Sequence, residues 1–340
     1  MRLTAARTAL VAVIASTALL LSGCVSGEGE SSSSAGDTVD GQVLDIDFAT
    51  YNPLSLIIKD QGWLEAEGVT VNWVQSAGSN KANEALRAGA IDVGSTAGSA
   101  ALLARSNGSP IKTIAIYSQP EWAALVAPKG SAITSVAQLR GKSVAATKGT
   151  DPYFFLLQAL EANGLTARDV TVQNLQHADG WAALQNGSVD AWAGLDPIMA
   201  GAQQTGATLF YRNLDFNSYG FLNAREDFLA EKPALAQLVV DSYAAAATWA
   251  TQNPERTAQI LADAAGLDPA VANTVITERS NLDVDQVPGP TQLAVLQKIG
   301  PTFVELGDVP DQQQVDDALA SIIDDGFAKK ADGSRVGQST

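Results

Sequence analysis

The stretch EALRAGAIDV at residues 84–93 recurs 98 residues later as AALQNGSVDA at residues 182–191. Each copy has the pattern of a helix end, a glycine, a tight turn and a buried strand. Asp92 and Asp190 occupy the same position in the two copies, and an acidic residue at a turn favours a capping role over a chemical one. Two similar units in one chain predict two lobes of like topology.

Strand-like and helix-like segments alternate on both sides of this repeat. The globular body is expected to begin near Val43, because residues 43–48 alternate between apolar and polar side chains. After Arg225 the strand signals end, and helical patterns occupy residues 233–252, 254–265, 269–280 and 291–306. This order predicts an α/β fold with a helical C-terminal tail.

The N-terminal segment has the features of a secretory signal peptide. Arg2 and Arg7 come before an apolar run at residues 8–21, which is shorter than the roughly 20 residues of a membrane-spanning helix. Cys24, the only cysteine, follows the sequence LSG and resembles the acylated cysteine of a bacterial lipobox. We expect residues 1–23 to be removed and Cys24 to carry a lipid anchor. The alternative is a buried cysteine on an N-terminal helix.

Residues 24–41 are rich in serine, glycine and acidic residues, a composition that predicts a flexible tether. The whole chain has 37 Asp and Glu against 21 Lys and Arg, which argues against nucleic acid as a partner. A single histidine, His177, and a single cysteine leave no His/Cys cluster for a metal and no HExxH motif. Without a G-x-S-x-G motif, an enzyme is disfavoured, although a carboxylate-based hydrolase stays open.

Several motifs resemble the bacterial substrate-binding proteins for sulfonates, nitrate, taurine and related solutes. These motifs are LRGK at 139–142, KGT at 148–150, NGL at 163–165, and GSVDAW at 187–192 running into Asp196-Pro197. The resemblance extends from about Leu44 to Gln252 and is greatest for the aliphatic-sulfonate branch. It implies a two-lobed periplasmic-binding-protein fold of type II, with the ligand between the lobes.

The resemblance also implies the domain organisation and the partners. We expect lobe 1 at residues 42–127, lobe 2 at residues 128–222, and a return at residues 223–340 whose helical tail completes lobe 1. The implied protein is a monomeric lipoprotein held at the outer face of the cytoplasmic membrane through Cys24. It would deliver a small solute to an ABC permease, without a cofactor or metal. The implied solute is an aliphatic sulfonate used in sulfur assimilation. The alternatives are a taurine-like zwitterion, nitrate, a thiamine-precursor pyrimidine, or a scaffold role without transport.

Loops at the carboxyl ends of strands are the expected ligand contacts, because ligands bind there in open α/β sheets. Helix N-termini offer free N–H groups for an oxyanion. In lobe 1 we expect Ser95 and Thr96 to donate hydroxyl groups from a loop, with plain helix capping as the alternative. Ser79 and Asn80 form a second candidate loop, and Ser79 is also expected to cap the helix that follows.

In lobe 2 the loop containing Thr150 and Asp151 is the corresponding site, with Lys148 as its only base. Asp151 and Asp196 each precede a proline, which predicts helix N-caps. Alternatively, Asp196 accepts a hydrogen bond from a ligand amine, and Glu121 allows the same interpretation.

Aromatic side chains on or beside the same loops can supply apolar area and one polar donor each. The candidates are Tyr51, Trp122, Trp192 and Tyr219, with core packing as the alternative for each; Trp181 is assigned to the core. Such side chains suit the tail of an organosulfonate or a flat heterocycle better than bare nitrate.

Overall fold

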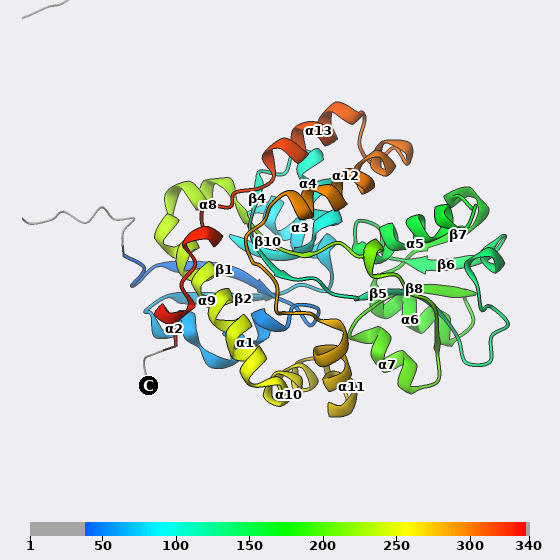
Figure 1. Ribbon diagram of the computed structural model, residues 1–340, viewed down its shortest axis with the longest axis horizontal. Coiled ribbons are helices and arrows are strands. Elements are labelled where there is room, and N and C mark those ends of the chain that lie inside the picture. Colours follow the sequence, from blue (N-terminus) through cyan, green and yellow to red (C-terminus); the bar gives the residue numbers. More distant parts are fainter. Residues whose placement is uncertain (1–37, 338–340) are drawn as a thin grey trace, which may run out of the picture. The chain divides into compact units, whose positions relative to one another are not determined.

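The computed structural model describes residues 38–337. The predicted signal peptide, Cys24 and most of the predicted tether lie outside this range. Among residues 38–337, no helix is both long and apolar enough to cross a membrane. Two five-stranded mixed sheets form the centre of the described part of the chain (Figure 1).

Sheet 1 has the strand order β2-β1-β3-β10-β4. Its strands are β1 (Val43–Phe48), β2 (Thr70–Gln75), β3 (Val93–Ala97), β4 (Ile111–Ser118) and β10 (Gly220–Arg225). β1 is parallel to β2 and β3, whereas β10 is antiparallel to β3 and β4. Helices α1 (Pro53–Gln61), α3 (Ser79–Ala88) and α4 (Gly98–Ser106) connect the strands. We call this sheet and its helices lobe 1.

Sheet 2 repeats the arrangement with the order β7-β6-β8-β5-β9. Its strands are β5 (Ala123–Ala127), β6 (Ser143–Ala146), β7 (Thr171–Asn174), β8 (Ala191–Leu195) and β9 (Thr208–Tyr211). Helices α5 (Asp151–Ala162), α6 (His177–Gln185) and α7 (Ile198–Gln204) connect them and complete lobe 2. The strands that follow the two sequence repeats, β3 and β8, are the central strands of the two sheets, so the prediction of like topology is confirmed.

Both copies of the repeat use the same local chemistry. Gly89 and Gly187 have φ angles of 68° and 74°, the left-handed conformation that glycine adopts without strain. Asp92 accepts a hydrogen bond from the Asp45 backbone at 3.2 Å, and Asp190 accepts one from the Ser143 backbone at 2.8 Å. Each carboxylate therefore fastens its turn to the neighbouring parallel strand, as a capping role requires.

The chain crosses between the sheets at residues 119–122 and again between β9 and β10. The predicted lobe boundaries at 127/128 and 222/223 need correction, because β5 pairs with β8 and β9 in sheet 2 and all of β10 lies in sheet 1. The expected boundary at 127/128 places the strands on both sides of the loop at residues 119–122 in lobe 1. In the structure those two strands belong to different sheets.

The tail covers lobe 1, as predicted. It consists of α8 (Glu226–Glu231), α9 (Pro233–Gln252), α10 (Pro254–Ala265), α11 (Pro269–Thr274), η4 (Val275–Arg279), α12 (Pro290–Glu305) and α13 (Gln312–Ser321). α9 and α10 pack on α1, while α12 and α13 pack on α4. α11 also contacts α7 of lobe 2, so the tail reaches both lobes near η4.

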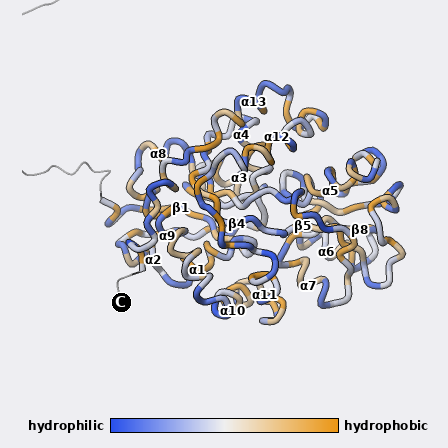
Figure 2. Tube along the Cα trace, viewed as in Figure 1, coloured by the Kyte–Doolittle hydropathy of each residue, from blue (hydrophilic) through white to orange (hydrophobic). Residues whose placement is uncertain are grey.

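The central strands are apolar because helices or other strands cover them on both faces. Every residue of β3, β5 and β8 is buried. Figure 2 shows hydrophobic residues concentrated along the strands, with more hydrophilic residues in the outer loops. This packing fixes the carboxyl ends of the strands, where the loops of the two lobes meet.

Candidate ligand-binding site

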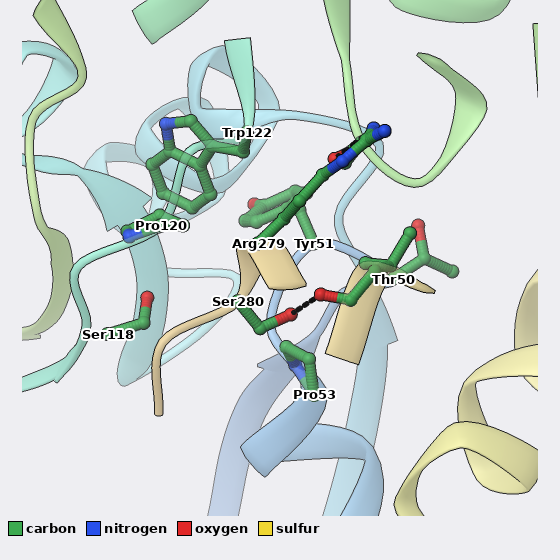
Figure 3. A pocket seen from close by; sticks show the side chains of 10 residues that line it. Thr50, Tyr51, Pro53, Ser118, Pro120, Trp122, Arg279 and Ser280 are labelled. Atoms are coloured by element: carbon green, nitrogen blue, oxygen red, sulfur yellow. Dashed lines mark hydrogen bonds and ion pairs between the residues drawn. The ribbon is translucent and has the colours of Figure 1, made fainter. Parts of the chain in front are cut away.

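Two small pockets lie side by side between the lobes, and Tyr51 and Trp122 line both. The Arg279 pocket is a partly open crevice with a free volume of about 10 Å³, room for about one water molecule (Figure 3). Its lining consists of Thr50, Tyr51, Pro53, Ser118, Pro120, Trp122, Asp196, Val275, Arg279 and Ser280. The Asp151 pocket has no free volume for a water molecule as it stands, and it is lined by Tyr51, Ser79, Ala97, Trp122, Thr150, Asp151, Pro152 and Leu195.

The aromatic wall between the pockets is rigid. Tyr51 and Trp122 form an edge-to-face pair with ring centroids 6.1 Å apart and planes at 83°. The Tyr51 hydroxyl donates to the Ser95 carbonyl at 2.9 Å, and Trp122 Nε1 donates to Asp151 at 2.7 Å. With both polar atoms occupied by the protein, the two rings present mainly apolar surface to the pockets.

Asp151 is the centre of the second pocket and a link between the lobes. Its carboxylate accepts hydrogen bonds from Ser99 Oγ at 2.7 Å, Trp122 Nε1 at 2.7 Å, and the backbone N and Oγ of Ser218 at 2.8 and 2.6 Å. Ser99 belongs to α4 of lobe 1 and Ser218 to the return crossing. Burial raises the pKa of Asp151, and these hydrogen bonds oppose the shift.

The predicted cap role of Asp151 is wrong by one residue. Thr150 is the N-cap residue of α5, with an extended backbone at φ −132°, and Asp151 is the first helical residue. Thr150 Oγ1 donates to the Thr147 carbonyl at 2.6 Å, so it does not bind an α5 N–H group. Asp151 is thus free to direct its carboxylate away from α5 and toward lobe 1.

Asp196 and Arg279 form a second link between lobe 2 and the tail. Arg279 Nη1 lies 3.2 and 3.1 Å from the two Asp196 oxygens, and its Nη2 donates to Gln203. Asp196 Oδ1 also accepts from the Ala200 backbone at 3.0 Å in the first turn of α7, but Pro197 is the N-cap residue, so the predicted cap position of Asp196 is wrong by one residue. Arg279 occupies the place that the alternative interpretation gave to a ligand amine.

The Asp196 pKa is raised to about 6 because burial outweighs the opposing effect of the Arg279 charge. Asp47, at the end of β1, is a further buried acid behind the aromatic wall. It accepts from the Ser95 backbone at 2.9 Å and from Ser95 Oγ at 3.0 Å. Burial raises the pKa of Asp47 to about 7, although hydrogen bonds from Ser95 and Ser76 lower it.

Ser95 and Thr96 lie within strand β3, so their predicted loop is wrong. Ser95 is engaged with Asp47, and Thr96 Oγ1 accepts from Asn223 Nδ2 at 2.7 Å in the interior of sheet 1. Neither residue lines the Arg279 pocket or the Asp151 pocket. Small polar side chains at residues 95–99 have the composition of a loop, but here they satisfy buried partners on neighbouring elements.

Ser79 lines the Asp151 pocket, whereas Asn80 does not line either pocket. Ser79 is the first residue of α3, and Gly78 is the N-cap, so the prediction that Ser79 caps the helix is wrong. Its Oγ instead accepts from the Ala97 backbone at 2.9 Å. Asn80 Oδ1 is buried and has no hydrogen-bond partner.

Three further candidates lie away from both pockets. Glu121 pairs with Arg212, whose Nε is 2.9 Å from its carboxylate. Trp192 is fully buried in the core of lobe 2, against Trp181, with ring centroids 5.9 Å apart. Core packing therefore applies to both tryptophans. Tyr219 lines a separate groove against the tail. Its backbone carbonyl accepts a hydrogen bond from Gly98 N of lobe 1.

His177 is buried at the start of α6, where lobe 2 meets lobe 1. Thr147 Oγ1 donates its proton to the Leu175 carbonyl, so the contact with His177 Nδ1 at 3.1 Å places a proton on Nδ1. A Cβ at Gly78 would lie 2.9 Å from His177 Nε2, so only glycine permits this approach. Burial lowers the pKa of His177 to about 4, which keeps the ring neutral.

Three residues of the site were missed by sequence reasoning: Asp47, Ser218 and Arg279. Ser99 belongs to the stretch at residues 95–99 whose hydroxyl groups were expected to donate, and Asp47 was assigned to an alternating strand. Arg279 and Ser218 carry no local signal, since their partners Asp196 and Asp151 are 83 and 67 residues away. Within residues 38–337, no three His, Cys, Asp or Glu side chains are placed to hold a metal ion.

The arrangement suits binding of a small solute between the lobes. Aromatic rings supply apolar area, a buried guanidinium supplies positive charge, and buried carboxylates link the lobes. The side chains come from lobe 1, lobe 2, both crossings and the tail. A ligand in either pocket therefore touches parts of the chain that move relative to each other if the lobes open.

Comparison with known proteins agrees with this geometry. A relative from Escherichia coli is named as an aliphatic sulfonates-binding protein. It is 30% identical over 212 residues, which cover 62% of this chain and 66% of that protein. A relative from Bacillus subtilis with the same name is 29% identical and covers 81% of this chain and 82% of its own.

Among solved structures, the alkanesulfonate-binding protein SsuA from Xanthomonas axonopodis pv. citri, bound to MOPS, has a TM-score of 0.74 at 25% identity. The alignment covers 82% of this chain and 98% of SsuA, so the expected two-lobed binding-protein fold is confirmed. The family model described as NMT1/THI5 like matches residues 55–257. Because that match spans more than half of the chain, the protein belongs to the NMT1/THI5-like family.

Proposed function

We propose that this protein is the extracytoplasmic solute-binding component of an ABC importer, and that its solute is an aliphatic sulfonate. The observation that carries the proposal is the pair of pockets between two like lobes, with an aromatic wall and a buried arginine. The naming of relatives that cover most of the chain supports the same solute class. A short alkyl tail would contact Tyr51 and Trp122, which already use their polar atoms within the protein.

The solute is tested by thermal shift and calorimetry with ethanesulfonate, taurine, nitrate and a pyrimidine. A ligand at 100 times its Kd should stabilise the protein by about 2.7 kcal/mol. We expect the largest shift with ethanesulfonate. A larger shift with another compound would reassign the solute, and turnover of any compound would favour the hydrolase alternative. An unchanged melting curve with all of them would favour a scaffold role.

The proposal includes a lipid anchor on a monomeric protein, with residues 1–23 removed and residues 24–41 as a tether. It rests on the sequence around Cys24. Cys24→Ser should abolish incorporation of labelled palmitate and release the protein from the membrane fraction, while ethanesulfonate affinity stays the same. Ser22→Ala, which leaves the cysteine in place, serves as the control. Retention of label in the Cys24→Ser protein would contradict the anchor.

A further inference from the structure

The two pockets differ in the hydrogen-bond donors that they leave free. In the Asp151 pocket, Ser99, Trp122 and Ser218 already donate to the protein's own carboxylate. A solute anion therefore finds these donors occupied while the lobes are in contact. The negative charge of Asp151 also opposes an anion placed beside it, because no Lys or Arg lines this pocket to offset that charge as Arg279 offsets Asp196 in the other pocket.

In the Arg279 pocket, one charged donor is free. Arg279 is only 6% exposed, and two of its three nitrogens are held by Asp196 and Gln203. Its Nε is buried and has no partner. Several buried side-chain polar atoms within residues 38–337 have no hydrogen bond, and Arg279 Nε is the only one of them that belongs to a charged side chain. A buried N–H of a guanidinium that lacks an acceptor is costly, so an acceptor from outside the chain, a water molecule or an oxygen of the solute, is expected there.

The neighbours of Arg279 fit a small organic anion. Figure 3 shows its side chain extended beside Tyr51, and Trp122 and Pro120 line the same pocket. Asp196 contacts Nη1 and Gln203 contacts Nη2, which leaves the Nε–H group as the free donor of the guanidinium. Hydrogen bonds between a guanidinium and an anionic oxygen are stronger than neutral ones.

We propose that Arg279 is the residue that selects an oxyanion in this site. Its Nε–H donates to a sulfonate oxygen of the solute in the Arg279 pocket, while Asp196 and Gln203 hold the guanidinium in place. This inference rests on the proposed function and adds where the charged group of the solute binds. The pocket has room for about one water molecule as it stands, so binding of the solute requires the side chains that line it to move apart.

The test compares ethanesulfonate with ethanesulfonamide, an uncharged compound of nearly the same shape, by calorimetry at pH 7.5. The wild-type protein should prefer ethanesulfonate, and Arg279→Gln should reduce that preference at least tenfold. A role limited to joining the lobes would weaken both compounds equally and leave the preference unchanged. Asp196→Asn breaks the ion pair but keeps Nε–H, so it should retain the preference.

Arg256→Gln is the matched control, because Arg256 also pairs with an aspartate, Asp60 at 3.2 Å, on the exposed surface. An unchanged preference in Arg279→Gln would overturn the inference while leaving sulfonate binding in place. Failure of the wild-type protein to bind any sulfonate would instead overturn the proposed function. If Arg279→Gln does not fold, Arg279→Lys keeps the charge without Nε–H, and a preference equal to wild type would equally overturn the inference.

Discussion

Buried ionisable side chains give this protein an unusual response to pH. Asp47 has its pKa raised to about 7 by burial, so the native state binds a proton that the unfolded state releases near pH 4. The free energy of unfolding contributed by Asp47 is therefore greatest at low pH and falls as the pH rises from about 4 to 7. His177, with its pKa lowered to about 4, acts in the opposite direction between pH 4 and 6.5.

The contribution of Asp47 can be isolated with Asp47→Asn, which cannot titrate. Between pH 4.5 and 7.5 the wild-type protein should lose about 3 kcal/mol of stability relative to the variant, at about 1.4 kcal/mol for each pH unit below the pKa of about 7. Urea unfolding at three pH values measures this difference. His177 is present in both proteins, so its opposing contribution cancels. Parallel pH profiles would show that Asp47 titrates normally.

A substitution at Thr96 tests whether this residue binds the ligand, as the sequence suggested, or stabilises sheet 1, as the structure indicates. Thr96→Val should lower the free energy of unfolding by about 1–3 kcal/mol, because Asn223 Nδ2 loses its acceptor at 2.7 Å inside sheet 1. Ethanesulfonate affinity should not change, since Thr96 lines neither pocket. Thr171→Val on the exposed surface of β7 is the control. Weaker ethanesulfonate binding with unchanged stability would restore Thr96 to the ligand site.

At the scale of elements, the N-terminus of α5 is joined to lobe 1 through Asp151. Asp151→Asn keeps the size of the side chain but turns an amide group toward donors that need an acceptor. We expect a loss of about 1–3 kcal/mol in the free energy of unfolding. Asp179→Asn, in the exposed first turn of α6, is a matched control with no expected effect. Equal stability of the two variants would show that the interlobe hydrogen bonds of Asp151 contribute nothing.

Elements were predictable where their signals are local. α9 and α10 begin at Pro233 and Pro254 as predicted, because proline favours the first turn of a helix and Gly266 ends the second one. The repeat similarly located the turns before β3 and β8. The predicted helix at residues 269–280 divides into α11 and the π-helical turn η4, which places Arg279 against Asp196.

The site was predicted less well because its hydrogen bonds join distant segments. Tyr51, Ser79, Trp122, Thr150, Asp151 and Asp196 do line the two pockets. Ser95, Thr96 and Trp192 have the same residue types as site residues, yet buried partners in the sheets and core occupy them. Local sequence cannot distinguish these cases, since the partner decides the role. Asp151, for example, has the sequence context of a helix cap, but in the structure it accepts hydrogen bonds from Ser218.

At the scale of the whole molecule, hydrogen bonds of Asp151 to lobe 1 and the ion pair of Arg279 with Asp196 join the lobes without a ligand. The double variant Asp151→Asn with Arg279→Gln should therefore have a larger radius of gyration than the ligand-free wild type in small-angle scattering. A ligand bound to both lobes favours the closed state through its differential affinity. Arg256→Gln should match wild type. Identical curves for the double variant and wild type would show that other contacts keep the lobes closed.

The position of β10 sets the order in which a growing chain can complete its lobes. β10 lies between β3 and β4 in sheet 1, but all five strands of sheet 2 come before it in the sequence. During synthesis from the N-terminus, the whole of sheet 2 is available before the strand that joins β3 to β4 exists. Sheet 2 can therefore form completely before sheet 1, although lobe 1 begins earlier in the sequence. Strands β1 to β4 cannot form their complete sheet until β10 has been synthesised.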